Sequence, residues 1–261
     1  MGTAGPSLQK PAYSLYRLAI NLGMSVGPVL GGWLAPISFQ SIFYVDGFTA
    51  IAAGLLINRL PSATKRRLTE PSSSPRRSIL LSDPKFSYFL LSLLPVMIIF
   101  IQHEAAMPLY LVRDLHFRES AFGLLFPINT LLIIFLEVPL NTAMAHWPHA
   151  RSIALGSFLT GLGFGALAWA NDFSQVAVTV VIWTFGEMIL FPACAAYAAE
   201  IAPPRYRGRY MGLYAMSFSL AFAIGPALGS LVLESFGGQF LWGGTIALGV
   251  LSAVMTLRLR R

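Results

Sequence analysis

The chain has 261 residues, of which 56% are hydrophobic and only 11% are charged, and its formal net charge is +7. Soluble globular domains carry about 25% charged residues, so this composition excludes most soluble enzymes and an intrinsically disordered chain. The single cysteine, Cys194, excludes a disulfide scaffold.

Apolar runs dominate the chain from near its start to its end. A helix that crosses a bilayer needs about 20 mostly apolar residues, and turn residues such as Asn171-Asp172 and Gly237-Gly238 separate the runs. The pattern predicts an all-α integral membrane protein with eight transmembrane helices, most of them antiparallel to the next. The runs are Ser14–Leu34, Ser41–Ile57, Phe86–Leu111, Ala121–Leu140, Ile153–Ala170, Gln175–Ile201, Tyr210–Leu233 and Gln239–Leu257.

One long polar segment interrupts the runs. Residues 59–85 are rich in Pro, Ser, Lys and Arg, which is typical of a flexible linker. We therefore expect three parts: residues 1–58 with two helices, the linker 59–85, and residues 86–261 with six helices.

Positive charge is distributed unevenly over the predicted loops. Eight spans place both termini on one side of the membrane, and 16 of the 18 Lys and Arg residues then share that side. Only Arg113 and Arg118 lie on the other side. The positive-inside rule predicts that both termini and the linker are cytoplasmic, in the plasma (inner) membrane. The pI near 9.9 is thus explained by topology, and no nucleic-acid partner is expected.

An internal repeat links the two ends of the chain. The segment Gly27-Pro28-Val29-Leu30-Gly31-Gly32 recurs 198 residues later as Gly225-Pro226-Ala227-Leu228-Gly229-Ser230. Some transporters are built from two parallel six-helix repeats. On that interpretation the first two spans are the end of a first half whose four preceding helices are missing, and the last six spans are a complete second half.

These residues resemble the major facilitator superfamily, in its drug/proton-antiporter-like branch. The resemblance implies a twelve-helix fold of which this chain is similar to helices 5–12. It rests on the fifth-helix signature (motif C) and on segments that look like the tenth helix and the turn after it. The matching residues are Arg17, Asn21, Gly23, Gly27, Pro28, Gly31 and Gly32; Gly186, Glu187 and Pro192; and Arg205, Arg207, Gly208 and Arg209.

The glycines of motif C have a physical reason. Small residues let two helices approach closely where lipid supplies no hydrophobic driving force, and Pro28 removes a backbone hydrogen bond and bends its helix. The motif therefore serves packing alone, or packing together with gating. The repeat copy, with Gly225, Pro226 and Gly229, is expected to face lipid, a partner or nothing stable, because its packing helix would be absent.

Acidic residues inside spans are candidates for a transport pathway. A charge at a helix centre costs roughly 2.5–3.5 kcal/mol on insertion scales, so it usually faces a cavity or a partner. Glu187 lies near the middle of its span, and Glu104, with Gln102 and His103, lies slightly outward of the middle. These side chains form either a protonatable, substrate-contacting wall or a structural hydrogen-bonded set. The resemblance implies that the seventh and tenth helices line a central path. Tyr110 and Asn129 are added to this candidate set.

Other polar residues are given structural roles. Asp46 is expected in the first turns of its helix, where it would complement the helix dipole, and Glu137 is expected to be solvated near a membrane boundary. His146 and His149 have no third ligand nearby, so no metal site is predicted. The glycines at 161, 163 and 165 lie inside an apolar run without a preceding strand, so they indicate helix packing rather than a nucleotide loop.

The sequence predicts a secondary active transporter that exports small molecules by alternating access. No nucleotide-binding loop is visible, so the expected energy source is an ion gradient, taken to be protons, and no cofactor is expected. Membrane lipid and a small-molecule substrate are the expected partners. The alternative is a truncated permease fragment with a structural or assembly role, which would need a separately encoded N-terminal fragment or self-association. A membrane-embedded enzyme is disfavoured because no nucleophile with a base is visible.

Overall fold

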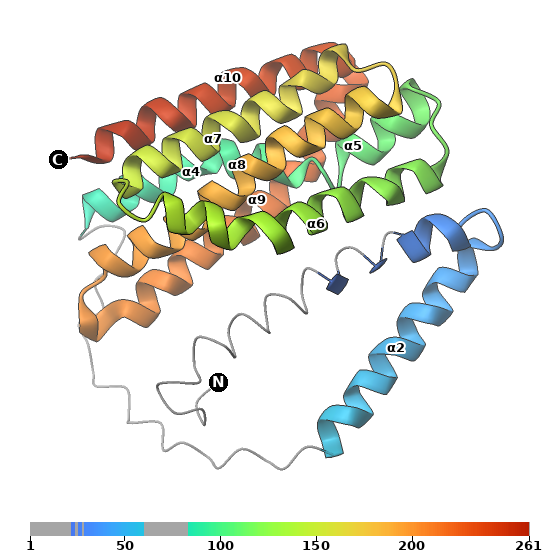
Figure 1. The fold of residues 1–261 in the computed structure, drawn as a ribbon, viewed down its shortest axis with the longest axis horizontal. Coiled ribbons are helices and arrows are strands. Elements are labelled where there is room, and N and C mark those ends of the chain that lie inside the picture. The colour runs from blue at the N-terminus through green and yellow to red at the C-terminus, as the bar shows by residue number, and fades with distance from the viewer. Residues whose placement is uncertain (1–21, 24–25, 28, 60–82, 261) are drawn as a thin grey trace. The chain divides into compact units, whose positions relative to one another are not determined.

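The computed structural model describes residues 22–23, 26–27, 29–59 and 83–260, and the regular structure in these ranges is helical (Figure 1). The described residues form two compact units. One holds those up to Arg59 together with Glu119–Thr130, and the other holds the remaining residues. Most of the predicted linker, 59–85, lies outside the described residues, and the predicted domain boundaries stay a prediction.

Seven segments among the described residues are long and apolar enough to cross a membrane. They confirm the second to eighth predicted spans. The first predicted span lies largely outside the described residues, although 29–34 are helical. The seven segments are Phe39–Arg59, Pro84–Asp114, Glu119–Ala143, His149–Trp169, Phe173–Ile201, Pro204–Phe236 and Gly238–Leu257.

The helices begin and end where local chemistry dictates. The helices are α2 (Phe39–Arg59), α4 (Pro84–Ile101), α5 (Ala106–Leu109), α6 (Glu119–Ala143), α7 (His149–Gly165), α8 (Phe173–Ile201), α9 (Arg207–Phe236) and α10 (Gly238–Leu257). Asp83 and Asp172 cap α4 and α8, each accepting a backbone N–H at 2.9 Å. Gly237, with φ of 81°, makes the tight turn from α9 into α10.

Glycines bring α7 into close contact with α8 and α10. A Cβ added at Gly161 would lie 2.7 Å from the Cα of Gly249 on α10, and one added at Gly156 would lie 2.8 Å from Leu190 on α8. A Cβ at Gly163 would collide with Trp183. These approaches are possible because none of these glycines carries a side chain. The prediction that the 161–165 glycines serve helix packing is confirmed.

Apolar side chains cover much of the outer surface. Helix α2 has no buried residue, and its Phe48, Ile51 and Leu55 are each more than 60% exposed. Contiguous exposed apolar surface on this scale requires an apolar surrounding. Together with the seven spans, it identifies the chain as an integral membrane protein.

Two acidic residues differ from expectation. Asp46 does not lie at a helix start, because α2 begins at Phe39, two turns earlier. The prediction that Asp46 complements the dipole of this helix is therefore wrong. Glu137 is not solvated: only 8% of it is exposed. It lies within α6, whose C-terminal part extends to Ala143 and leaves Glu137 nearly two turns from the helix end.

Candidate functional site

The span Pro84–Asp114 is broken in its C-terminal half. Helix α4 ends at Ile101, a turn follows over 102–105, and α5 leads into a π-helical stretch, Tyr110–Asp114. Pro108 explains the break, since it has no N–H for the carbonyl of Glu104 and its ring crowds that carbonyl. The backbone turns through bonds from Ala105 N (3.3 Å) and Met107 N (2.9 Å) to the carbonyl of Gln102. Non-helical backbone at membrane depth is tolerated where protein or a cavity surrounds it.

The break carries an imidazole and a carboxylate in contact. His103 Nε2 lies 3.4 Å from Glu104 Oε1, and His103 Nδ1 lies 2.6 Å from the carbonyl oxygen of Phe100. Because a carbonyl can only accept, Nδ1 carries its hydrogen, and Nε2 is left to face the carboxylate. The His103 side chain is 8% exposed and that of Glu104 is 36% exposed. Glu104 therefore lies on the more exposed side of the pair.

Glu187 lies on the face of α8 that meets this part of α4. The Phe100 ring contacts Trp183 and Phe191, at centroid distances of 6.1 and 4.8 Å. These residues are one turn before and one turn after Glu187, so all three share a face. The His103 ring also lies 5.8 Å from that of Trp183. The structure thus brings half-buried Glu187 to the same aromatic-lined region as the imidazole–carboxylate pair.

Gln102 joins α4 to the repeat copy on α9. It is 2% exposed, and its Nε2 donates to the carbonyls of Ile98 and Gly225, both at 2.9 Å. Gly225 and Gly229 are buried, and a Cβ at Gly229 would collide with Gln102 Oε1. The expectation that this repeat copy has no packing helix is therefore wrong, because α4 fills that role. Helix α9 continues through Pro226.

The two other pathway candidates are Tyr110 and Asn129. Tyr110 is buried toward the C-terminal end of the broken span: its ring lies 5.6 Å from that of Trp242, and a Cβ at Gly238 would collide with it. This position favours a packing role. Asn129 belongs to the other compact unit, with Glu119–Thr130. The contacts described for Tyr110 are with Trp242, Gly238 and the carbonyl of Leu167.

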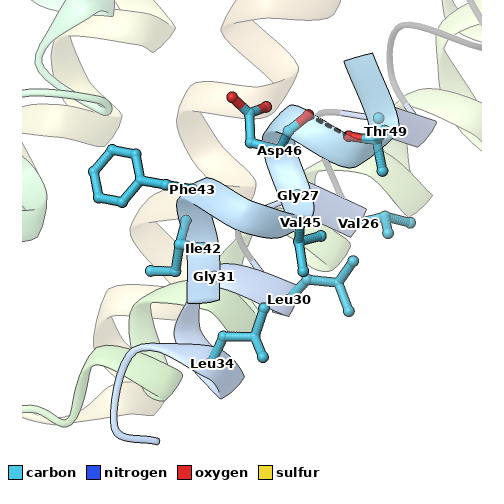
Figure 2. A pocket seen from close by; sticks show the side chains of 11 residues that line it. Val26, Gly27, Leu30, Gly31, Leu34, Ile42, Phe43, Val45, Asp46 and Thr49 are labelled. Carbon is cyan, nitrogen blue, oxygen red and sulfur yellow. Dashed lines mark hydrogen bonds between the residues drawn. The ribbon is translucent and has the colours of Figure 1, made fainter. Parts of the chain in front are cut away.

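The described glycines of motif C line a groove (Figure 2). Gly23, Gly27 and Gly31 have no atom within 4 Å of an added Cβ, so they are not in close helix contact. They border a cavity of about 450 Å³ whose other wall is the N-terminal half of α2, including Phe43 and Asp46. Gly32 differs, since its added Cβ would lie 3.2 Å from the Glu119 carbonyl oxygen. Arg17, Asn21 and Pro28 lie outside the described residues.

The basic turn before α9 is exposed and organised around an aromatic ring. The guanidinium carbons of Arg205 and Arg209 each lie 5.9 Å from the centroid of Tyr206, a cation–π distance. Arg207 and Gly208 are exposed beside them. At the end of this turn, Tyr210 donates to Asp83 Oδ2 at 2.7 Å and ties α9 to the start of α4.

A hydrogen bond that the sequence did not indicate supports α8 at Pro192. Pro192 has no N–H to offer the carbonyl of Met188. Asn141 Nδ2, on α6, donates to that carbonyl at 3.0 Å and also to the Glu137 carbonyl at 2.8 Å. An amide from a neighbouring helix thus satisfies a carbonyl that the proline leaves free inside the membrane. Asn141 therefore helps to hold α8 in place around Pro192.

Outside the break, His149 at the start of α7 contacts the end of α8. His149 Nε2 lies 3.1 Å from Glu200 Oε2. In the ranges that the structure describes, no group of three or more His, Cys, Asp or Glu residues could hold a metal ion.

The sequence did contain signals for two features that were not predicted, the break in the span Pro84–Asp114 and the aromatic face that carries Glu187. Proline four residues after Glu104 marks the break. Aromatic residues four positions before and after Glu187 mark its lined face. Whether the break after α4 meets the aromatic face of α8 depends on how the two helices pack, and no local sequence pattern specifies that packing.

Comparison with known proteins identifies the family. The family model of the Major Facilitator Superfamily matches residues 3–118 and 103–261. The uncharacterized MFS-type transporter YttB of Bacillus subtilis (strain 168) is 22% identical over 266 residues, which cover 98% of this chain and 66% of that protein. A Na(+), Li(+), K(+)/H(+) antiporter of Planococcus maritimus is 19% identical over 226 residues, covering 76% of this chain and 53% of the antiporter.

The fold agrees with this match. A crystal structure of a POT family transporter in complex with 5-aminolevulinic acid superposes with a TM-score of 0.54 at 17% identity, covering 98% of this chain and 54% of that one. The chain spans about half to two thirds of the length of the curated relatives it matches. The relatives and the structural neighbour are transporters rather than enzymes. From the match over nearly its whole length, the chain belongs to the Major Facilitator Superfamily.

Proposed function

We propose that this chain is a proton-coupled exporter of small amphipathic molecules that works by alternating access in the plasma membrane. The observation that carries the proposal is the break in the span Pro84–Asp114, which holds the His103–Glu104 pair at membrane depth. Transporters commonly place substrate and coupling-ion sites at discontinuous helices near the bilayer midplane. The antiporter among the relatives supports an exchange mechanism.

The pair has the geometry of a proton site. With Nδ1–H held by the Phe100 carbonyl, a proton that arrives at Glu104 forms a hydrogen bond between Oε1 and His103 Nε2. Loss of that proton leaves a carboxylate beside a neutral imidazole. The two states differ by one charge, so proton uptake and release changes the electrostatic field that a bound cation experiences.

The surrounding side chains suit an aromatic cation. Glu187 supplies a second carboxylate on α8, and Phe100, Trp183 and Phe191 supply aromatic rings where its face of α8 meets α4. Aromatic faces attract cations, most strongly where water is excluded. Competition between a proton and a cationic substrate for the carboxylates would couple export of one to entry of the other.

Proteoliposomes test the proposal. The purified chain is reconstituted with an acidic lumen, and uptake of ethidium is followed by fluorescence on DNA trapped inside. We expect accumulation that nigericin abolishes, and we expect Glu104→Gln to remove it because the amide cannot take up a proton. Glu234→Gln is the matched control, since Glu234 is an exposed carboxylate on α9; this variant should accumulate ethidium at the unaltered rate.

Two results would count against the proposal. Gradient-driven uptake by Glu104→Gln at the unaltered rate would remove the pair from coupling. A folded chain that shows no uptake in any condition would favour the alternative role as a fragment that assembles with another polypeptide.

Orientation is tested by labelling. Cys194 is buried, so single cysteines introduced at Arg118 and Arg207 report their own accessibility. In intact cells we expect an impermeant maleimide to label Arg118→Cys and not Arg207→Cys. Labelling of both positions from outside would contradict cytoplasmic termini.

A further inference from the structure

A basic surface lies where α9 and α4 begin, at the start of the membrane span Pro204–Phe236. Its members are four exposed cationic side chains, Lys85, Arg205, Arg207 and Arg209. Figure 1 shows both helix starts on the left of the view, and a hydrogen bond joins them, since Tyr210 of α9 donates to Asp83 at 2.7 Å. Residues at the start of a span lie at the depth of the lipid headgroups.

Carboxylates do not neutralise this basic surface. Of the two acidic residues that flank it, Asp83 already accepts hydrogen bonds from the backbone of α4 and from the tyrosine of α9. The other, Glu200, contacts His149 at 3.1 Å. With both carboxylates counted against the four cations, the net charge is still +2. Three of the cations form no ion pair within the described part of the chain: Lys85, Arg207 and Arg209.

The stability of α9 does not explain these cations. The first turn of α9 contains no acidic residue, and cations at a helix start are repelled by the helix dipole. The ring of Tyr206 nevertheless keeps two of them together, because the guanidinium carbons of Arg205 and Arg209 each lie 5.9 Å from its centroid. The basic surface is therefore unfavourable for the helix alone, and a bound anionic group would offset its charge.

Apolar side chains continue from the basic surface along one face of α9. Met216 and Leu220 follow Arg209 by seven and eleven positions, about two and three helical turns, so the three share a face. Met216 is 63% exposed and Leu220 is 48% exposed. The helix rises roughly 16 Å between Arg209 and Leu220, about the hydrocarbon thickness of one leaflet. This face matches a molecule with an anionic head and a long apolar tail.

We propose that the basic surface binds an anionic phospholipid, with the phosphate beside Arg207 and Arg209 and an acyl chain along Met216 and Leu220. Attraction of anionic lipid to Lys and Arg near the membrane surface is worth about 5-fold in affinity per side chain. Phosphatidylcholine carries the same phosphate, but its choline adds a positive charge, so it gains much less here. The site is independent of the proposed proton coupling, and its test needs no gradient and no transport.

Quenching by brominated lipid tests the site in the full chain. A bimane probe is attached to the cysteine of Gly212→Cys, because Gly212 lies between Arg209 and Met216 and an added Cβ meets no atom within 4 Å. Cys194 is buried, so the probe reports one position. Phosphatidylcholine nanodiscs receive equal small fractions of brominated phosphatidylglycerol or brominated phosphatidylcholine. We expect the phosphatidylglycerol to reach half-quenching at a roughly 5- to 25-fold lower fraction, and the difference to shrink at high salt.

Two double variants of the probe-carrying chain locate the effect. Arg207→Gln with Arg209→Gln should bring the two lipids roughly to parity. Arg113→Gln with Arg118→Gln is the matched control, because it removes the same charge from exposed positions at and beyond the far end of the span Pro84–Asp114. This control should keep the preference for phosphatidylglycerol. Gel filtration confirms that each variant is folded.

Three outcomes would overturn the proposal. Equal quenching by the two brominated lipids would mean that the basic surface does not recognise the charge of the headgroup. Equal loss of preference in the two double variants would reduce the effect to the net charge of the chain. Relief of quenching by sodium phosphate, beyond that by sodium chloride at the same ionic strength, would assign the surface to a free anion. The comparison of the two lipids keeps all the arginines, so it decides the question even if a double variant does not fold.

Discussion

The contact between α7 and α10 provides a sharp test of the packing. Replacing Gly249 by alanine would place a Cβ 2.7 Å from the Cα of Gly161 and 3.0 Å from the carbonyl oxygen of Ser157. Ordinary contact begins near 3.4 Å, so the two backbones would have to separate by about 0.7 Å. That movement would also stretch the 3.2 Å contact between the hydroxyls of Ser252 and Ser157.

The expected cost follows from these distances. Overpacking of a well-packed core costs about 1–3 kcal/mol, and backbone atoms give way less easily than flexible side chains. We therefore expect Gly249→Ala to lower the free energy of unfolding by about 1–3 kcal/mol. The measurement is equilibrium unfolding of the purified chain in mixed micelles titrated with SDS, followed by tryptophan fluorescence.

A control lies on the same helix. A Cβ at Gly243 would meet no atom within 4 Å. Since alanine is favoured over glycine in helices by about 1 kcal/mol, Gly243→Ala should be neutral or stabilising. Equal destabilisation by the two variants would refute the close α7–α10 approach.

Two further predictions concern single hydrogen bonds. Asn141→Leu should destabilise the chain by about 1 kcal/mol, because the carbonyl of Met188 loses its donor. The loss should shrink in a Pro192→Ala background, which restores a backbone N–H; equal losses in the two backgrounds would contradict the proposed support. Tyr210→Phe should cost about 0.5–1.5 kcal/mol, and Asp83→Ala should cost more in the same unfolding assay, because it also removes the cap of α4; the reverse order would contradict the assigned contacts.

The spans could be predicted from sequence because their signal is local. A run of about 20 apolar residues is set by bilayer thickness, and capping residues such as Asp83 and Asp172 mark helix starts. The break at 102–105 was not predicted, because its polar residues lie inside one long apolar run, Phe86–Leu111, which was interpreted as a single span. Its cause is Pro108, which acts on a carbonyl four residues earlier.

The candidate site was only partly predictable, because much of it depends on packing between helices. His103, Glu104 and Glu187 stand out as polar groups in apolar runs, and the structure brings their helices together. The burial of Glu137 and the contact of Gln102 with Gly229 depend on residues far away in the sequence. No periodicity along one helix reports which neighbour that helix will meet. The role of motif C in gating therefore stays a prediction.

Proton release on substrate binding tests the central claim most directly. The purified chain in weakly buffered detergent solution is mixed with tetraphenylphosphonium, and a pH indicator records the protons set free. The His103–Glu104 pair predicts that the unaltered chain and Glu234→Gln release a proton, whereas Glu104→Gln, although it remains folded, releases none. Equal release from Glu104→Gln, or binding without any release from the unaltered chain, would contradict proton exchange at the break in the span Pro84–Asp114.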